Sequence, residues 1–251
     1  MKISVITSAY NSAETIGDTL DSVRQQDYPS IEYIVVDGAS SDGTMDIVAE
    51  YDDIVSLSIS EPDSGIYDAL NKGIALATGD VVGFLHSDDL FADLGVVSKI
   101  ARAFQSSGTD AVYGDLDYVE RADPNQIHRK WRSKPFDPAL FYKGWMPAHP
   151  TFYLKRAHYE TFGVYDTSFR QSADYELMLR MLLKQKLNAV YIPELLVKMR
   201  VGGASNVTLG NRWNANQEDA RAWKKNGLKP GLLTRFLKPL SKIGQFLAPS
   251  P

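Results

Sequence analysis

The sequence predicts an α/β protein in which helices flank a mixed, mainly parallel β-sheet. Strand and helix patterns alternate through the first half of the chain, and the strand patterns are largely apolar, as in buried parallel strands. Polar and acidic residues follow several of these strands, at the position where ligands bind to such sheets. The 251 residues are 44% hydrophobic and 11% aromatic, so the chain can form one large domain with a hydrophobic core.

The first half, residues 1–110, alternates regularly between the two kinds of element. Strands are expected at residues 3–7, 31–37, 54–59 and 81–85, and helices at residues 13–26, 44–51, 66–77 and 94–104. Ser12 is the expected N-cap of the first helix. Because each helix connects two strands, right-handed crossovers would make the strands parallel. This half therefore has the pattern of a nucleotide-binding α/β unit.

The second half, residues 111–228, has shorter and more varied elements. Strands are expected at residues 111–113, 117–120, 127–131, 189–192 and 195–200, and helices at residues 173–184 and 209–225. Aromatic side chains crowd residues 136–159. No repeat or low-complexity linker separates the halves, so we expect their strands to share one sheet.

Charge is distributed unevenly along the chain. Residues 221–251 hold seven basic and no acidic residues, which leaves 20 bases against 31 acids in the first 220 residues. Within the tail, residues 229–251, apolar residues recur every three or four positions with Lys and Arg between them, a pattern typical of a membrane-surface helix. The alternative is that this apolar face packs on the body or on a second subunit, as in a homodimer. The acidic body argues against nucleic-acid binding.

Two adjacent carboxylates, Asp88 and Asp89, follow the apolar run at residues 81–85. An unpaired charge is too costly to bury, so this pair needs a cation, and a divalent metal that holds a diphosphate is a natural candidate. The alternative is that the two residues cap the helix that follows. This stretch alone leaves both interpretations open.

Other polar residues also follow predicted strands. Ser8 and Tyr10 come after the first strand and Asp37 ends the second. The chain has neither a Gly-x-x-x-x-Gly-Lys-Ser/Thr loop nor a Gly-x-Gly-x-x-Gly motif at the glycines near Asp37. A nucleotide would instead be held by strand-end carboxylates and hydroxyls, with a metal on its phosphates. Taken alone, Asp37 is explained equally well as a turn former.

Six segments, taken in order, resemble glycosyltransferase family 2. They are ISVITSAYN (residues 3–11), VVDGASSDGT (35–44), NKGIA (71–75), SDD (87–89), ADYE (173–176) with Arg180, and MRVGGAS (199–205). The resemblance covers roughly residues 1–206 and implies a GT-A fold and, for most members, inverting transfer. The stretch SEPDSGIYDALNKG (60–73) further resembles bacterial members that build extracellular polysaccharide or lipopolysaccharide.

The resemblance implies roles for the residues that match the family motifs. Ser8 and Tyr10 would lie beside the nucleotide base, and Asp37 would contact the base or the ribose. Asp88 would face the ribose or the sugar, and Asp89 would ligate Mn²⁺ or Mg²⁺ on the diphosphate. These roles divide the chain into a nucleotide-sugar-binding half, residues 1–110, and an acceptor and catalytic half, residues 111–228.

Asp174 matches the general base of the family. Inverting transfer needs one carboxylate to take the proton of the acceptor hydroxyl, while the leaving diphosphate needs a cation and not a second acid. Asp174 opens a predicted helix, whose N-terminus favours the charged carboxylate. On physical grounds alone, a helix cap explains this position equally well.

Weaker candidates complete the predicted site. Those for the donor are Asp68, Asn71, Lys72 and Arg200, and those for the acceptor are Trp145, His149 and Arg180. Arg200 precedes two glycines that would let a loop close over a diphosphate. Four of these candidates also have a structural interpretation: Lys72 as a solvated helix charge, Arg180 as an i, i+4 partner of Glu176, His149 as a structural histidine, and Trp145 as a core aromatic.

The sequence as a whole predicts a metal-dependent, inverting glycosyltransferase. It would move a hexosyl or N-acetylhexosaminyl group from a nucleotide-diphosphate sugar, expected to be a UDP-sugar, to a saccharide or lipid-linked acceptor in cell-surface polysaccharide synthesis. The expected place is the cytoplasmic side of the cytoplasmic membrane, with peripheral contact through the tail. The rival interpretations are a retaining transferase of the same fold and a nucleotide- or carbohydrate-binding module without turnover.

Overall fold

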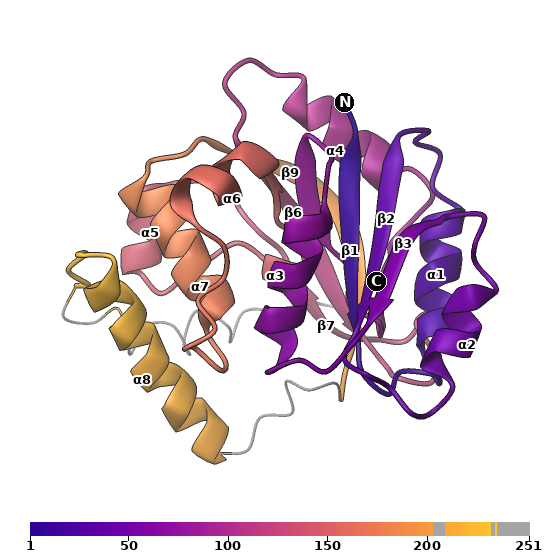
Figure 1. Cartoon of the computed structure of the whole chain (residues 1–251). Coiled ribbons are helices and arrows are strands. Elements are labelled where there is room, and N and C mark those ends of the chain that lie inside the picture. Colours follow the sequence, from indigo (N-terminus) through magenta and orange to yellow (C-terminus); the bar gives the residue numbers. More distant parts are fainter. Residues whose placement is uncertain (203–208, 232–233, 235–251) are drawn as a thin grey trace.

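The computed structural model describes residues 1–202, 209–231 and 234 (Figure 1). Its strands are β1 (Ile3–Ala9), β2 (Ile31–Asp37), β3 (Val55–Ser60), β4 (Val81–Phe84), β5 (Asp89–Phe91), β6 (Ala111–Val119), β7 (Ile127–Trp131), β8 (Tyr153–Lys155) and β9 (Ala189–Arg200). Its α-helices are α1 (Ile16–Arg24), α2 (Thr44–Ala49), α3 (Ile66–Leu76), α4 (Val96–Phe104), α5 (Pro138–Tyr142), α6 (Arg156–Phe162), α7 (Ala173–Met178) and α8 (Leu209–Lys225). A 3₁₀ turn, η1, covers His149–Thr151, and a π-helical segment, η2, covers Leu179–Lys184.

All the described strands join one mixed sheet in the order β3-β2-β1-β4-β8-β6-β9-β5, with β7 paired to β6. Strands β3, β2, β1 and β4 are parallel neighbours, as predicted from the alternating pattern of the first half. Helix α3 lies in front of the sheet in Figure 1 and α4 lies behind it, so both faces are covered. The sheet interior is apolar because side chains of β1, β2 and β4 such as Ile6, Val35 and Val82 are fully buried.

The register of the parallel strands brings their carboxyl ends to one level. Ala9 of β1 pairs with Asp37 of β2, and Asp37 pairs with Ser60 of β3. On the other side of β1, Ile6 pairs with Phe84, so the residues after β4 emerge next to Ser8. The loops that follow these strands therefore open at the same edge of the sheet.

Strand β8 joins the two halves of the chain in one sheet, which confirms the expectation of a shared sheet. It runs antiparallel to β4, where Val82 pairs with Leu154, and antiparallel to β6, where Leu154 pairs with Ala111. The pairing leaves no gap between β4 and the strands of the second half. Side chains from both halves can therefore meet at one edge of the sheet.

Two pairs of short predicted strands are each one long strand in the structure. The break expected after Tyr113 is only a register shift within β6. Gly114 lies at this shift, where an added Cβ would come within 2.5 Å of the Leu196 side chain, so the close packing of β6 on β9 excludes a larger residue. The break expected between residues 192 and 195 is likewise absent, because β9 runs through it.

Strand β5 was not predicted, and it settles one open question about the acidic pair. Asp89 begins this strand, which runs antiparallel to β9, with Asp89 opposite Met199. The next helix, α4, begins at Val96. Asp88 and Asp89 are therefore too far from that helix to cap it, and the capping interpretation is wrong.

The aromatic stretch 136–159 builds much of the core of the second half. It contains α5, η1, β8 and the start of α6, none of which was predicted. Phe141, Tyr153 and Tyr159 are all almost completely buried. Short elements packed around large rings explain why neither the 3.6-residue nor the 2-residue period is visible there.

The chain then returns through α7 and α8. The helix predicted at residues 173–184 is α-helical only as far as Met178 and continues as η2. Helix α8 has the predicted bounds and packs on α7, where Trp223 Nε1 donates to the Tyr175 hydroxyl at 3.0 Å. In the described part of the chain, every helix is too short or too polar to traverse a lipid bilayer. The predicted amphipathic segment lies almost entirely outside the described residues.

Candidate active site

The loops after β1 and β2 are tied to each other by hydrogen bonds. The Asn11 amide N–H donates to Ser40 Oγ at 2.7 Å, and the Ser41 N–H donates to Asn11 Oδ1 at 3.0 Å. Asn11 and Ala39 both have positive φ, 47° and 62°, and Ala39 has no polar side chain that would favour this conformation. Such locally unfavourable backbone persists where the surrounding contacts hold it, often at functional sites.

Asp37 organises the loop after β2. Its Oδ2 accepts from the Ser40 N–H at 2.9 Å and from Ser60 Oγ at 2.6 Å, and its Oδ1 accepts from Ser40 Oγ. The side chain is fully buried. These contacts fit the turn-former interpretation of Asp37. Because both carboxylate oxygens are already hydrogen-bonded, a nucleotide would meet the loop that Asp37 orders and not a free carboxylate.

Tyr10, Gly38 and Asp63 meet where the loops after β1, β2 and β3 come together. A Cβ at Gly38 would lie 2.6 Å from the Asp63 carboxylate and 3.3 Å from the Tyr10 ring, so a larger residue would have to displace the Asp63 side chain. The Tyr10 side chain is 67% exposed. An exposed ring beside a carboxylate offers a stacking face and a hydrogen-bond acceptor to a planar group such as a base.

His86, which was not predicted as a site residue, lies close to groups from both halves of the chain. Its Nδ1 is 3.1 Å from Ser8 Oγ. Burial lowers the pKa of His86, which the nearby charge of His149 lowers further, while the negative charges of Asp88 and Asp174 oppose the shift. The ring is therefore predominantly neutral near pH 7. Its position directly after an apolar strand was the signal that could have identified it.

Asp88 and Asp89 differ sharply in exposure. Asp89 is fully buried, and neither carboxylate oxygen has a hydrogen-bond partner among the described residues. Burial and the negative charge of Asp88 raise the pKa of Asp89 well above its ordinary value, although Arg200 opposes this shift. Asp88 is partly exposed. The structure therefore favours Asp88 over the predicted Asp89 as the carboxylate that a ligand from solvent can reach.

The acidic pair fits a divalent cation in one respect and is incomplete in another. A buried carboxylate without hydrogen bonds is the kind of group that a nearby cation stabilises. However, no group of three or more His, Asp or Glu side chains within the described residues is arranged to enclose a metal. Mg²⁺-type sites often take only one or two carboxylates and complete their shell with substrate phosphates and water. The residues present therefore fit a metal that arrives with a diphosphate.

Arg200 lies beside the acidic pair but uses its guanidinium to hold loops. It donates to the Asp88 carbonyl at 3.3 Å and to the Arg121 carbonyl at 3.0 Å, and it forms an ion pair with Asp18. Only 3% of the residue is exposed. The predicted contact with a diphosphate would require these bonds to be exchanged. As described, Arg200 fixes the backbone that carries Asp88.

Asp174 is not a helix cap. The N-cap of α7 is Ser172, and Asp174 lies in the first turn with 18% of its side chain exposed. One carboxylate oxygen, Oδ2, is 3.3 Å from His149 Nδ1, and the other, Oδ1, accepts from the Tyr67 hydroxyl at 3.4 Å. The charge of Asp174 also acts on His86 and Tyr118. The predicted base and the predicted acceptor residue His149 are therefore in contact, next to the end of β4.

The predicted donor residues of α3 have structural partners. Asn71 forms two hydrogen bonds with the backbone of Tyr165. Its Nδ2 donates to the Tyr165 carbonyl and its Oδ1 accepts from the Tyr165 N–H, both at 2.9 Å. Lys72 Nζ contacts the Pro62 carbonyl at 2.9 Å and Glu61 at 2.8 Å. Asp68 Oδ2 accepts from the Ser64 N–H at 3.0 Å. These side chains order the loop between β3 and α3 and anchor the segment before α7.

Two predicted acceptor residues lie in the core instead. The Arg180 guanidinium pairs with buried Glu176 at 3.0 Å and donates to backbone carbonyls of residues 162–164, so its donors are used within the protein. The Trp145 ring lies edge-on to Tyr113 and Phe141, with centroids 6.1 and 6.2 Å away. Both residues therefore match the structural interpretations of their positions.

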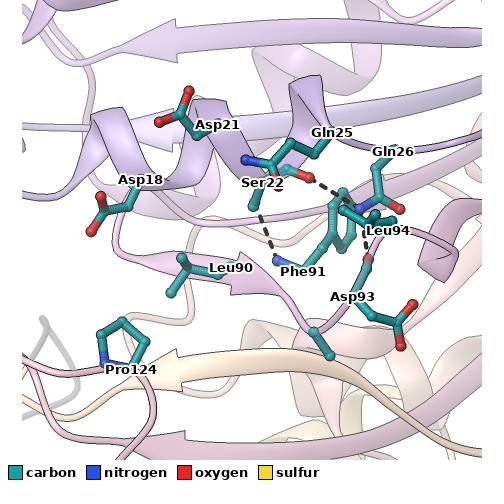
Figure 2. A pocket seen from close by; sticks show the side chains of 11 residues that line it. Asp18, Asp21, Ser22, Gln25, Gln26, Leu90, Phe91, Asp93, Leu94 and Pro124 are labelled. Carbon is teal, nitrogen blue, oxygen red and sulfur yellow. Dashed lines mark hydrogen bonds between the residues drawn. The ribbon is translucent and has the colours of Figure 1, made fainter.

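A groove of about 460 Å³ lies between α1 and the β5 region (Figure 2). It is lined by side chains of α1 and of the β5 region, including Asp18, Asp21 and Asp93. Ser22 Oγ accepts from the Phe91 N–H at 3.2 Å across it, which satisfies the outer edge of β5. None of the predicted site residues lines this groove.

Comparisons with known proteins identify the family of the chain. Residues 4–175, more than half of the chain, match the family described as Glycosyl transferase family 2. The chain belongs to this family and is a glycosyltransferase. An uncharacterized glycosyltransferase of Mycobacterium tuberculosis is 33% identical over 188 residues, which cover 71% of this chain and 68% of that protein. A PGL/p-HBAD biosynthesis glycosyltransferase of Mycobacterium bovis is 28% identical over 213 residues, 81% of this chain and 78% of that one.

Solved structures show the same fold. A mannosyltransferase from Pyrobaculum calidifontis, in complex with GDP-Man and Mn²⁺, superimposes with a TM-score of 0.67 at 20% identity and covers 100% of this chain and 76% of its own. Staphylococcus aureus TarS 1–349, in complex with UDP-GlcNAc, has a TM-score of 0.68 at 19% identity, with 98% and 72% covered. The fold is therefore the GT-A fold, as the sequence resemblance implied.

The buried Asp89 makes the stability of the metal-free protein depend on pH. Because its pKa is raised in the folded state, Asp89 favours folding below its ordinary pKa near 4, and this contribution is lost as pH rises through the raised value. Asp89→Asn should therefore unfold at a higher temperature than wild type at pH 8, on the order of 5 °C, and close to it at pH 4. Thermal unfolding in a chelator across pH 4–8 measures this. Exposed Asp52→Asn is the control, and equal pH slopes for Asp89→Asn and wild type would refute the assignment.

Proposed function

We propose that the protein is an inverting, metal-dependent glycosyltransferase that moves a sugar from a nucleotide-diphosphate donor to a saccharide or lipid-linked acceptor in cell-surface polysaccharide synthesis. The observation that carries this proposal is the position of Asp174. Its carboxylate is partly exposed, is not used as a helix cap, and lies beside His149 near the carboxyl end of β4. A single base at this place is what an inverting displacement requires.

Asp174 is proposed as the general base. As the acceptor hydroxyl attacks the anomeric carbon, a bond forms between that oxygen and the carbon, and the bond from the carbon to the diphosphate oxygen breaks. The hydroxyl proton passes to a carboxylate oxygen of Asp174. His149, 3.3 Å from Oδ2, is placed to orient the carboxylate and to contact the acceptor.

The acidic pair is proposed to hold Mn²⁺ or Mg²⁺ on the donor. Asp88, which is partly exposed, would contact the ion, and the buried charge of Asp89 would lie behind it. When bound, such a cation neutralises negative charge that develops on the leaving diphosphate. Asp88 in turn is held in place by Arg200, which donates to its carbonyl.

The loops after β1, β2 and β3 are proposed to hold the nucleotide. The exposed Tyr10 ring would stack on the base, with Ser8 and the loop built on Asp37 beside it. Asp68, Asn71 and Lys72 would act by ordering the adjacent loop and not by direct contact. A UDP-sugar carrying a hexosyl or N-acetylhexosaminyl group is the proposed donor, since solved relatives of this fold include complexes with UDP-GlcNAc and with GDP-Man.

The proposed setting is the inner face of the cytoplasmic membrane, with the tail as a peripheral contact. The support is its sequence, which combines regularly spaced apolar residues with basic residues and no acid. A lipid-linked acceptor would then be met at the membrane surface. The competing role for the same apolar face is contact with a second subunit in a homodimer.

Replacement of the proposed base tests the function. With Mn²⁺, nucleoside diphosphate release from UDP-glucose, UDP-N-acetylglucosamine and GDP-mannose identifies the donor that the wild type turns over. Asp174→Asn should lower kcat on that donor by roughly 10²–10⁴-fold, because no carboxylate is left to take the proton of the attacking hydroxyl. Asp88→Asn should instead raise the Mn²⁺ concentration needed for half-maximal rate. Exposed Asp52→Asn is the matched control, and wild-type rates in both site variants would exclude the proposed site.

Deletion of residues 235–251 tests the membrane contact. The truncated protein should lose binding to vesicles that contain anionic lipid, because the deletion removes most of the apolar residues and the charges Arg235, Lys238 and Lys242. Co-sedimentation with vesicles at low and high salt measures this. Vesicle binding equal to that of the full chain would refute the membrane contact, and a change from dimer to monomer in sedimentation would assign the tail to the subunit interface.

A further inference from the structure

Tyr67, in the first turn of α3, has its hydroxyl directed at the candidate base, although sequence reasoning gave it no role. We propose that Tyr67 is a positioning residue: its hydroxyl donates to Oδ1 of Asp174 and holds the carboxylate where it can take the proton of the acceptor. This inference rests on the proposed function of Asp174. The two residues are 107 positions apart in the chain and belong to different halves of the fold.

The position of the Tyr67 ring is fixed by its neighbours. It stacks on Tyr165, with centroids 5.5 Å apart and planes inclined by 28°, and Tyr165 in turn lies edge-on to Phe84 of β4 at 5.6 Å. Asn71, one turn further along α3, forms two hydrogen bonds of 2.9 Å with the Tyr165 backbone. Helix α3 therefore holds both the ring and the segment against which the ring rests.

The Tyr67 hydroxyl remains protonated and can act only as a donor toward the carboxylate. Burial raises the pKa of Tyr67 far above its ordinary value, and the negative charge of Asp174 raises it further. A phenol with a lower pKa could transfer its proton to the base and so compete with the acceptor hydroxyl. Here the proton stays on the phenol oxygen, and the carboxylate remains the only strong base of the pair.

The contacts of Asp174 leave room for its reaction. A carboxylate offers about four lone-pair positions, and two neighbours among the described residues use one on each oxygen, Tyr67 at Oδ1 and His149 at Oδ2. Two partners on opposite oxygens fix the plane of the carboxylate. The Oδ1 distance of 3.4 Å is long for an O–H···O bond, as is common for catalytic hydrogen bonds before the substrate binds.

Tyr67→Phe removes the hydroxyl and keeps the stacked ring. With Mn²⁺ and the donor that the wild type turns over, we expect kcat to fall by about 10- to 100-fold, because a small misplacement of a reacting group costs this much. KM for the donor and the melting temperature should stay within about twofold and a few degrees of wild type, since the donor loops are untouched. Tyr153→Phe is the matched control, because its hydroxyl is also buried and has no hydrogen-bond partner in the described structure. It should have wild-type kinetics.

A double substitution separates positioning of Asp174 from a general structural role. In the Asp174→Asn background, Tyr67→Phe should lower the residual rate no further, because the group that it positions is already gone; a structural defect would lower both rates by the same factor. A crystal structure of Tyr67→Phe should also show the Asp174 carboxylate rotated from its wild-type position. Unchanged kcat in Tyr67→Phe, together with an unmoved carboxylate, would overturn the inference while leaving Asp174 as the base. Full activity of Asp174→Asn would instead overturn the proposed function itself.

Discussion

The structure depends on the convergence of strand ends at one edge of the sheet. Because Ala9, Asp37 and Ser60 share one level, and β4 ends beside Ser8, the polar groups after four strands must find partners in a small volume. Most do so within the protein: Asp37 binds two serines, and Arg200 holds the backbone of Asp88. Asp89 is the exception, since its buried carboxylate has no hydrogen-bond partner among the described residues. A buried carboxylate without such a partner is suited to a ligand that brings a cation.

The second half of the chain contributes the proposed base, Asp174, to this edge. Strand β8 joins β4 to β6, and the segment that follows α6 returns to place Asp174 against Tyr67 and His149. Asn71 and Tyr165 connect α3 to this returning segment. One helix, α3, thereby holds both the loop after β3 and the segment that leads to the proposed base, which would keep the two substrates in a fixed relation. Positioning of this sort supplies much of the rate in a displacement reaction.

The sequence predicted the parallel half well because its signals are local. Apolar runs and helical spacing gave β2 its bounds, and the ordered motifs gave the family and the fold. It failed where contacts between distant parts of the chain decide the structure. Strand β5 is only three residues long and exists because β9 lies beside it. Spacing likewise could not show that Arg180 is consumed by Glu176 and by backbone carbonyls, or that Asp89 is buried while Asp88 is not. Tyr67 was overlooked because its partner lies in the other half of the chain.

In the proposed reaction a single carboxylate, Asp174, activates the acceptor for direct displacement at the anomeric carbon. Direct displacement inverts the configuration of that carbon, whereas retention requires a different chemical course. Proton NMR of the product formed from an α-linked nucleotide sugar, recorded before secondary reactions, measures the outcome directly. Activation by Asp174 should give a β-linked product. An α-linked product would exclude direct displacement and would identify a retaining transferase of the same fold.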